Sequence, residues 1–215
     1  MRGDPKSVTL LRPKSVKAAL AMAAASPGAL CIAGGTDVMV AWNAGQIKPK
    51  TVIDLSTLGD WRKIALQGAK ITIGALATHA EIQDHPLIKN AFPLLAQASS
   101  VIGCAQIQNR GTLGGNIANA SPAGDTFPAL LVYDARVVIV SRSGQRTVAL
   151  EGFFTGVKKN VLRPGELISS IEIDRAVRSA LKHYPSVYQI DSDRLAALRP
   201  EVIVTQAHCE VCAVS

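Results

Sequence analysis

Hydrophobic and polar positions change over short segments, which predicts a chain of short strands and helices. Residues 16–25 carry apolar side chains at helical spacing, and Ser15 before them is a suitable N-cap. Short strands are expected on both sides of this helix, over residues 7–13 and 29–34. A further buried strand is expected over residues 51–56. These elements together predict a small α/β unit.

From residue 61 onward the pattern predicts a second set of elements. Alternating positions over residues 61–76 predict a β-hairpin that turns at Gly68. Residues 78–103 have a mostly helical pattern that two prolines interrupt. Residues 126–150 predict a helix followed by two strands, and residues 167–173 predict a last strand after a Pro-Gly turn. Helices and strands are therefore mixed along the whole segment.

One stretch, residues 107–125 (IQNRGTLGGNIANASPAGD), interrupts this order. It contains four glycines and shows almost no helical or strand periodicity, so we expect a long functional loop. Glycines let the backbone turn through positive φ, and successive N–H groups in such turns suit phosphate oxygens. A glycine-rich structural turn explains the same composition, and composition alone leaves the two interpretations equal.

Another glycine segment lies upstream, at Gly34-Gly35-Thr36-Asp37, between the strand over residues 29–34 and a helix-like run. A glycine pair between a strand and a helix places several unpaired N–H groups at one point, which favours a pyrophosphate ligand. Gly-Gly before a helix is also a common steric turn, so this segment alone supports both interpretations equally.

Three polar residues near these glycines have competing interpretations. Thr78 is a suitable N-cap, and Glu81 three residues later gives the spacing of a capping box. Contact with a ligand is an equal interpretation for Thr78 and His79. Arg110 could pair with a phosphate or a partner, and a structural salt bridge is slightly favoured.

Composition narrows the class of protein. The 215 residues are 48% hydrophobic and 18% charged, which is typical of a globular chain with a substantial core. The net charge of +7 comes from scattered basic residues with few aromatic residues beside them. This pattern disfavours a nucleic-acid surface and favours an anionic ligand or partner.

Cysteine usage and hydropathy indicate the compartment. Cys31 and Cys104 are isolated and expected to be buried, while Cys209 and Cys212 form a C-x-x-C pair, so no disulfide framework is expected. No apolar run is long enough to span a bilayer, and two lysines interrupt the alanine-rich N-terminal region. We therefore expect a cytoplasmic protein with no signal peptide and no membrane partner.

Four motifs in order give a family resemblance: IAGGTDV, IGALATHAEI, NRGTLGGNIANASPAGD and ELISSIEI. At these distances they resemble the FAD-binding medium subunits of molybdenum hydroxylases, the group of xanthine dehydrogenase and carbon monoxide dehydrogenase. The resemblance covers about residues 8–175. Four ordered motifs are far more specific than one glycine loop.

The resemblance implies an α+β chain with the p-cresol methylhydroxylase-type FAD fold, made of two α/β subdomains over residues 1–60 and 61–177. It implies that the first loop's backbone binds the pyrophosphate, that the second loop lies over the flavin, and that single residues contact the ribityl or ribose and the isoalloxazine. The implied cofactor-binding residues are Ala33, Gly34, Gly35, Thr36, Asp37, Val38, Thr78, His79, Gly111, Thr112, Gly114, Gly115, Asn116, Asp125 and Ile168. Among these, Asp125 is assigned to the ribityl or ribose side and Ile168 to the isoalloxazine ring.

The chemistry that the resemblance implies is electron transfer. FAD would receive electrons from iron–sulfur clusters on a small partner subunit, supplied by a molybdopterin site on a large subunit, and pass them to NAD⁺ or another acceptor. The protein itself would bind and orient the cofactor, with no catalytic side chain and no metal site of its own. Covalent flavin attachment to His79 or His85 is disfavoured, because the family resembles non-covalent binders.

Residues 178–215 depart from the family pattern, which normally continues into a further domain. We interpret the chain as C-terminally truncated, with a tail that resembles a segment of periplasmic cobalamin- or metal-chelate-binding proteins. The C-x-x-C pair lacks a second ligand pair and is expected to be an ordinary reduced pair. Two alternatives follow: a non-catalytic remnant that acts in assembly or interaction, and a small-ligand module carried by the tail.

Overall fold

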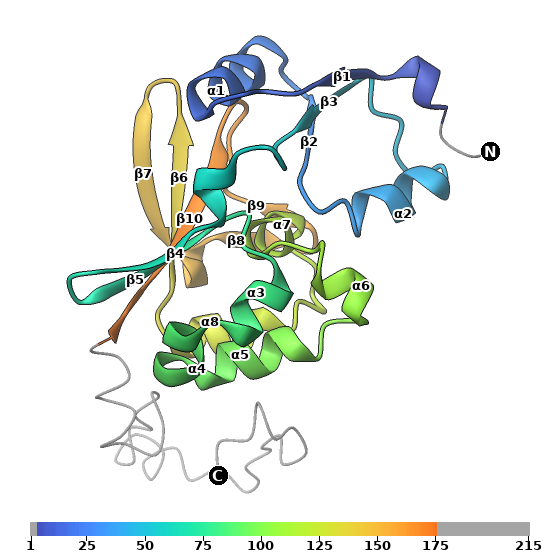
Figure 1. Ribbon diagram of the computed structural model, residues 1–215. Coiled ribbons are helices and arrows are strands. Elements are labelled where there is room, and N and C mark those ends of the chain that lie inside the picture. The colour runs from blue at the N-terminus through green and yellow to red at the C-terminus, as the bar shows by residue number, and fades with distance from the viewer. Residues whose placement is uncertain (1–3, 176–215) are drawn as a thin grey trace, which may run out of the picture.

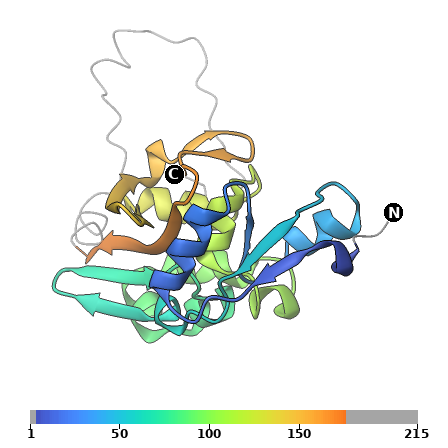
Figure 2. The same ribbon diagram turned by 90° about the horizontal axis from the view of Figure 1, so that it is seen from above.

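The computed structural model describes residues 4–175, which form two larger β-sheets and one two-stranded sheet, with helices around them (Figure 1). The first sheet is parallel, in the order β1-β3-β2. Its strands are β1 (Thr9–Leu11), β2 (Leu30–Ile32) and β3 (Thr51–Asp54). Helix α1 (Val16–Ala25) joins β1 to β2, and Ser15 caps it by accepting a hydrogen bond from the Ala18 N–H. Helix α2 (Val38–Asn43) lies at the outer end of this unit, away from the second sheet (Figures 1 and 2).

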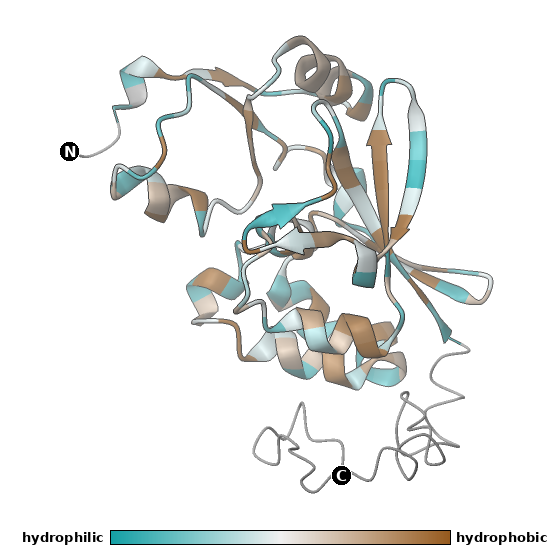
Figure 3. Cartoon of the chain, turned by 180° about the vertical axis from the view of Figure 1, so that it is seen from behind, coloured by the Kyte–Doolittle hydropathy of each residue, from teal (hydrophilic) through white to brown (hydrophobic). Residues whose placement is uncertain are grey.

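The second sheet has five antiparallel strands in the order β4-β5-β10-β6-β7. Its strands are β4 (Ile64–Gln67), β5 (Lys70–Gly74), β6 (Arg136–Ser141), β7 (Gly144–Ala149) and β10 (Leu167–Asp174). The last strand, β10, is central because it pairs with both β5 and β6. Strand β6 is mostly hydrophobic and buried, whereas the edge strand β7 is more polar and exposed (Figure 3). The sheet thus buries β6 and leaves β7 facing solvent.

Six helices follow β5. They are α3 (His79–Asp84), α4 (Pro86–Ala91), α5 (Pro93–Ser100), α6 (Ala105–Gln108), α7 (Leu113–Asn119) and α8 (Thr126–Val132). Prolines open α4 and α5, where the missing N–H removes no helical hydrogen bond. Figure 1 shows α3, α4, α5 and α8 gathered in one layer, with α7 between that layer and the first sheet.

Two hydrophobic clusters connect these layers. The larger cluster joins the second sheet to the helical layer and includes the fully buried Phe92, Leu130 and Ile139. The smaller cluster packs α1 and β3 against Leu76 and Leu167, which belong to the second half of the chain. The first sheet is therefore fixed against the second through a shared apolar contact.

A small hairpin and three single helical turns complete the described elements. They are η1 (Pro5–Ser7), η2 (Gly59–Arg62), η3 (Leu150–Gly152), β8 (Phe154–Gly156) and β9 (Lys159–Asn160). The β8–β9 hairpin is tied to α7, because the Lys158 N–H donates to the Ala120 carbonyl at 2.9 Å and Asn160 Nδ2 donates to the Ala118 carbonyl at 2.8 Å.

Most elements expected from the sequence are confirmed, but two expectations are wrong. Residues 107–125 are not one irregular loop, because α6 ends inside this range and α7 and its N-cap Thr112 occupy much of it. Cys104 is exposed rather than buried, and Cys31 is half-buried. The tail over residues 178–215, with its C-x-x-C pair, lies outside the described residues. Within the described range no helix is long and apolar enough to cross a membrane.

Candidate cofactor cleft

The segment that follows β2 presents a row of unused backbone donors. In the described part of the chain, none of the N–H groups from Gly34 to Val38 donates a hydrogen bond. The segment turns at Gly35, which has φ +75° and so adopts a conformation that suits glycine. Five neighbouring N–H groups without an acceptor favour an anionic ligand, since buried or clustered donors otherwise find partners in the protein.

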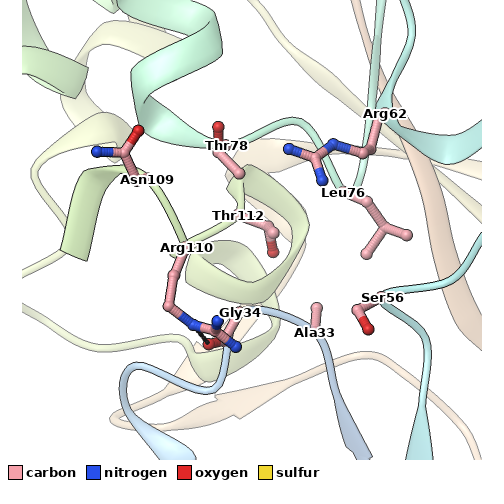
Figure 4. A pocket seen from close by; sticks show the side chains of 9 residues that line it. All are labelled: Ala33, Gly34, Ser56, Arg62, Leu76, Thr78, Asn109, Arg110 and Thr112. Atoms are coloured by element: carbon pink, nitrogen blue, oxygen red, sulfur yellow. Dashed lines mark hydrogen bonds between the residues drawn. The ribbon is translucent and has the colours of Figure 1, made fainter. Parts of the chain in front are cut away.

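Residues 34–38, called the first glycine segment below, lie directly beside residues 110–115, called the second glycine segment. A Cβ at Gly34 would overlap the carbonyl oxygen of Arg110, so only glycine permits the approach. The Arg110 Nε donates to the Gly34 carbonyl at 3.2 Å and holds the two segments together (Figure 4). The sequence favoured a salt bridge for Arg110, but no ion pair involves it within residues 4–175.

The second glycine segment starts helix α7, and its glycines serve close packing. The Gly114 N–H donates to the Ala75 carbonyl at 2.8 Å, and a Cβ at Gly114 would lie 2.6 Å from the Ala75 Cβ. The Gly115 N–H donates to Thr112 Oγ1 at 3.1 Å, which caps the helix. Because these N–H groups already have acceptors, this segment is not the row of free donors that its composition suggested. Among the glycines at 111, 114 and 115, none has positive φ.

Thr78 and His79 begin helix α3 next to this segment. Thr78 forms the expected capping box with Glu81, and the pKa of Glu81 is lowered overall, although burial raises it, by hydrogen bonds from Thr78 and Arg62 and by the charge of Arg62. Burial of the Glu81 carboxylate opposes this shift, and the hydrogen bonds outweigh it. His79 is 2% exposed, lies behind Gly111, and its Nδ1 has no hydrogen-bond partner. Burial lowers the pKa of His79 to about 4, so its imidazole is neutral at pH 7.

Adjoining cavities lie between the first segment and α7. The largest, of about 540 Å³, is lined by residues 30–38, by α7 and by Lys158. A mostly apolar cavity of about 260 Å³ extends from residues 29–33 to Leu76, Gly114 and Ile168. The third, of about 270 Å³, lies between Arg62 and Arg110, whose guanidinium groups extend from opposite sides (Figure 4). Together they form one cleft, because Ala33 lines all three cavities.

Most residues predicted from the sequence meet in this cleft. Those that line it are Ala33, Gly34, Gly35, Thr36, Asp37, Val38, Thr78, Thr112, Gly114, Gly115 and Ile168. Four others do not line these cavities: His79, Gly111, Asn116 and Asp125. Asn116 instead accepts a hydrogen bond from the Thr126 hydroxyl at 2.7 Å and ties α7 to α8. Asp125 is exposed immediately before α8.

Sequence reasoning missed two cations of the cleft, Arg62 and Lys158. Arg62 lines the third cavity and pairs with Glu81 at 2.8 Å, while Lys158 lines the largest cavity from the β8–β9 hairpin. Neither residue stands in a motif. The place of Arg62 at the start of the predicted hairpin was the one sequence feature that could have indicated its position. The position of Lys158 depends on a two-residue strand, which is too short to show a periodic pattern.

The geometry defines what the cleft can hold. Unpaired N–H groups gather at its centre, and its apolar end is formed by Leu76 and Ile168. Such a cleft suits a ligand with a phosphate-rich middle and a flat apolar group. Across the described residues, no group of three or more His, Cys, Asp or Glu side chains could hold a metal ion.

The chain is similar in sequence and fold to several known proteins. The chain is 40% identical over 147 residues to the nicotinate dehydrogenase FAD-subunit of Eubacterium barkeri, which covers 67% of this chain and 50% of that protein. Carbon monoxide dehydrogenase from Hydrogenophaga pseudoflava superposes with a TM-score of 0.76 at 31% identity, over 80% of this chain and 60% of that one. Quinoline 2-oxidoreductase from Pseudomonas putida 86 superposes with a TM-score of 0.77 at 25% identity, over 81% and 60%.

The match to a described family covers the whole part of the chain that contains the cleft. The chain spans about half the length of the curated relatives it matches. Residues 6–175 match the family described as the FAD binding domain in molybdopterin dehydrogenase. This chain therefore belongs to the family of FAD-binding domains of molybdopterin dehydrogenases.

Proposed function

We propose that this chain binds FAD in the cleft beside α7 and serves as the electron-transfer subunit of a molybdenum hydroxylase. Electrons would arrive from iron–sulfur clusters on a small partner subunit, fed by a molybdopterin-containing large subunit, and leave to NAD⁺ or another acceptor. The family match and the cleft geometry support this proposal. The single observation that carries it is the row of unpaired N–H groups from Gly34 to Val38.

The residues of the cleft fit the diphosphate of FAD. Backbone N–H groups bind phosphate oxygens without the desolvation cost of a buried lysine, and the first segment presents five of them. The absent side chain at Gly34 lets this segment approach the backbone of Arg110 and Gly111 closely, just before α7. A diphosphate placed there would satisfy groups that otherwise depend on water.

The apolar end of the cleft fits the isoalloxazine ring. Leu76, Ile168 and Gly114 line the cavity that begins at residues 29–33, just before the first glycine segment. When bound, FAD supplies reversible uptake and release of electrons, and the role of the chain is to bind it, orient it and restrict water. Glu166 borders this cavity and is held by Arg146, whose hydrogen bonds lower the pKa of Glu166 against the effect of burial.

Finer assignments belong to the same proposal. Asp125 would meet the ribityl or ribose hydroxyls and Thr78 would contact the cofactor, while His79 would act through the Gly111 backbone in front of it. The architecture would be the p-cresol methylhydroxylase type, with subdomains that divide near residue 60. The chain would work in the cytoplasm.

Titration of the purified chain with FAD tests the proposal. The free chain is stripped of flavin, and quenching of flavin fluorescence and the visible difference spectrum are followed as FAD is added. Saturable binding at one site per chain is expected. A chain that binds the iron–sulfur subunit but takes up no FAD would instead act as an interaction module, which is the alternative from the sequence.

A further inference from the structure

The β8–β9 hairpin places one lysine at the edge of the largest cavity. Lys158 lies at the turn between the two short strands and lines the cavity together with residues 30–38 and α7. It has φ +53°, a conformation that non-glycine residues rarely adopt. The tight turn of the hairpin therefore fixes the backbone of Lys158.

Two hydrogen bonds fix the hairpin to α7. The Lys158 N–H donates to the carbonyl of Ala120, which itself has φ +49° at the end of α7, and Asn160 Nδ2 donates to the Ala118 carbonyl. Thr112 and Gly115, at the N-terminal end of the same helix, line the same cavity as residues 34–38. Lys158 and the free N–H groups of residues 34–38 thus line one cavity together with α7.

The charges in this cavity are few. Among the residues that line it, only Asp37 and Lys158 carry charged side chains. Lys158 Nζ lies 3.8 Å from Asp37 Oδ2, and the two side chains are 57% and 52% exposed. An exposed ion pair of this length contributes little to stability. The Lys158 ammonium group can therefore leave Asp37 and pair with another anion at a small cost in free energy.

We infer that Lys158 is a phosphate-recognising residue of this cleft, and that a bound diphosphate replaces Asp37 as the partner of its ammonium group. The inference rests on the proposed function. The N–H groups of Gly34 to Val38 are uncharged dipoles, whereas a dinucleotide diphosphate carries two negative charges. Lys158 is the cation that the lining supplies for it, and the carboxylate of Asp37 alone would repel it.

A consequence for specificity follows. Riboflavin has the same ring system as FAD but no phosphate, so Lys158 should distinguish the two ligands. Loss of the Lys158 charge should weaken the binding of FAD and leave the binding of riboflavin unchanged. Loss of a residue that only shapes the cleft should weaken the binding of both ligands.

The test compares Lys158→Met with Lys159→Met, the adjacent lysine of the same hairpin, which does not line the cavity. Both variants remove one positive charge from one exposed hairpin. FAD and riboflavin affinities of each variant and of the wild-type chain are measured by flavin fluorescence at two salt concentrations. Lys158→Arg serves as the conservative variant, because it keeps the charge.

The expected result is a five- to tenfold loss of FAD affinity in Lys158→Met, about the effect of one partly exposed charged contact. Riboflavin affinity is unchanged, Lys159→Met resembles wild type, and Lys158→Arg recovers most of the loss. The salt dependence of FAD binding decreases in Lys158→Met. Equal FAD affinity in Lys158→Met and wild type overturns this inference alone. A wild-type chain that binds no FAD overturns the proposed function with it.

Discussion

A single added methyl group at Gly34 is the sharpest perturbation of the cleft. The Cβ of Gly34→Ala would overlap the Arg110 carbonyl oxygen and lie 3.0 Å from the Gly111 Cα. Both neighbours are backbone atoms, so no side chain can rotate away to relieve the contact. The first segment must separate from Arg110 and Gly111, which displaces its free N–H groups.

The size of the effect follows from the contact. Overpacking costs about 1–3 kcal/mol in ordinary cores, and a contact with backbone atoms belongs at the upper end, so we expect about 3 kcal/mol. For a chain of this size that lowers Tm by roughly 6–12 °C. Displacement of the segment also removes roughly two hydrogen bonds to charged phosphate, each worth about 1.5 kcal/mol, so FAD affinity falls by about 100-fold.

Thermal unfolding and FAD titration measure these two effects. Gly59→Ala is the matched control, because a Cβ there meets nothing within 4 Å and its φ is not positive. The control should keep the Tm and FAD affinity of wild type. A Gly34→Ala chain with wild-type Tm and wild-type FAD affinity would refute the close approach of the two segments and the reasoning built on it.

Three further predictions concern the supporting residues. His79 titrates near pH 4 when folded and near 6.5 when unfolded, so its contribution to stability is present above pH 6.5 and is lost as pH falls toward 4. This amounts to about 3 kcal/mol, and a His79→Gln chain should lack that part of the pH dependence in urea unfolding. Arg146→Met leaves the part-buried Glu166 carboxylate with only the Arg163 N–H as a donor and should cost about 2 kcal/mol, whereas Lys70→Met breaks a more exposed pair and should cost less than about 1 kcal/mol. Equal Tm losses in these two variants would contradict the burial argument. Thr78→Ala removes the cap of α3 and should cost about 1 kcal/mol in the same unfolding assay, and no change would contradict the capping box.

Local signals were enough to predict much of the fold. The hairpin turn at Gly68 and the helix starts at Pro86 and Pro93 depend on residues next to each other in the chain. The capping box of Thr78 and Glu81 is equally local and is present as predicted. Such features depend only on the geometry of one turn, so they can be predicted from neighbouring residues alone.

Features set by distant contacts could not be predicted in this way. Helix α7 contains Gly114 and Gly115, which weaken a helix by about 1 kcal/mol each and hide its pattern. Gly114 is tolerated because its missing side chain lets α7 pack against Ala75, nearly forty residues away in sequence (114 against 75). Helix propensity predicts a loop over α7, but tertiary packing stabilises a helix there.

Which of the two glycine segments has free N–H groups also could not be predicted from the sequence. Both segments looked like sources of free N–H groups from sequence. Only the first has them, because acceptors at Ala75, Ala77 and Thr112 use those of the second. The cations Arg62 and Lys158 reach the cleft through folding of separate elements, which no spacing along the chain records.

The central claim is that the backbone N–H groups of Gly34 to Val38 hold the diphosphate of FAD. Amide NMR of the ¹⁵N-labelled chain tests it most directly, with FAD and riboflavin added in separate titrations. The account predicts that the amide resonances of Gly34, Gly35 and Thr36 shift on addition of FAD and stay in place with riboflavin. Amides of this segment that remain unchanged while FAD binds elsewhere, or that shift equally with both ligands, would contradict it.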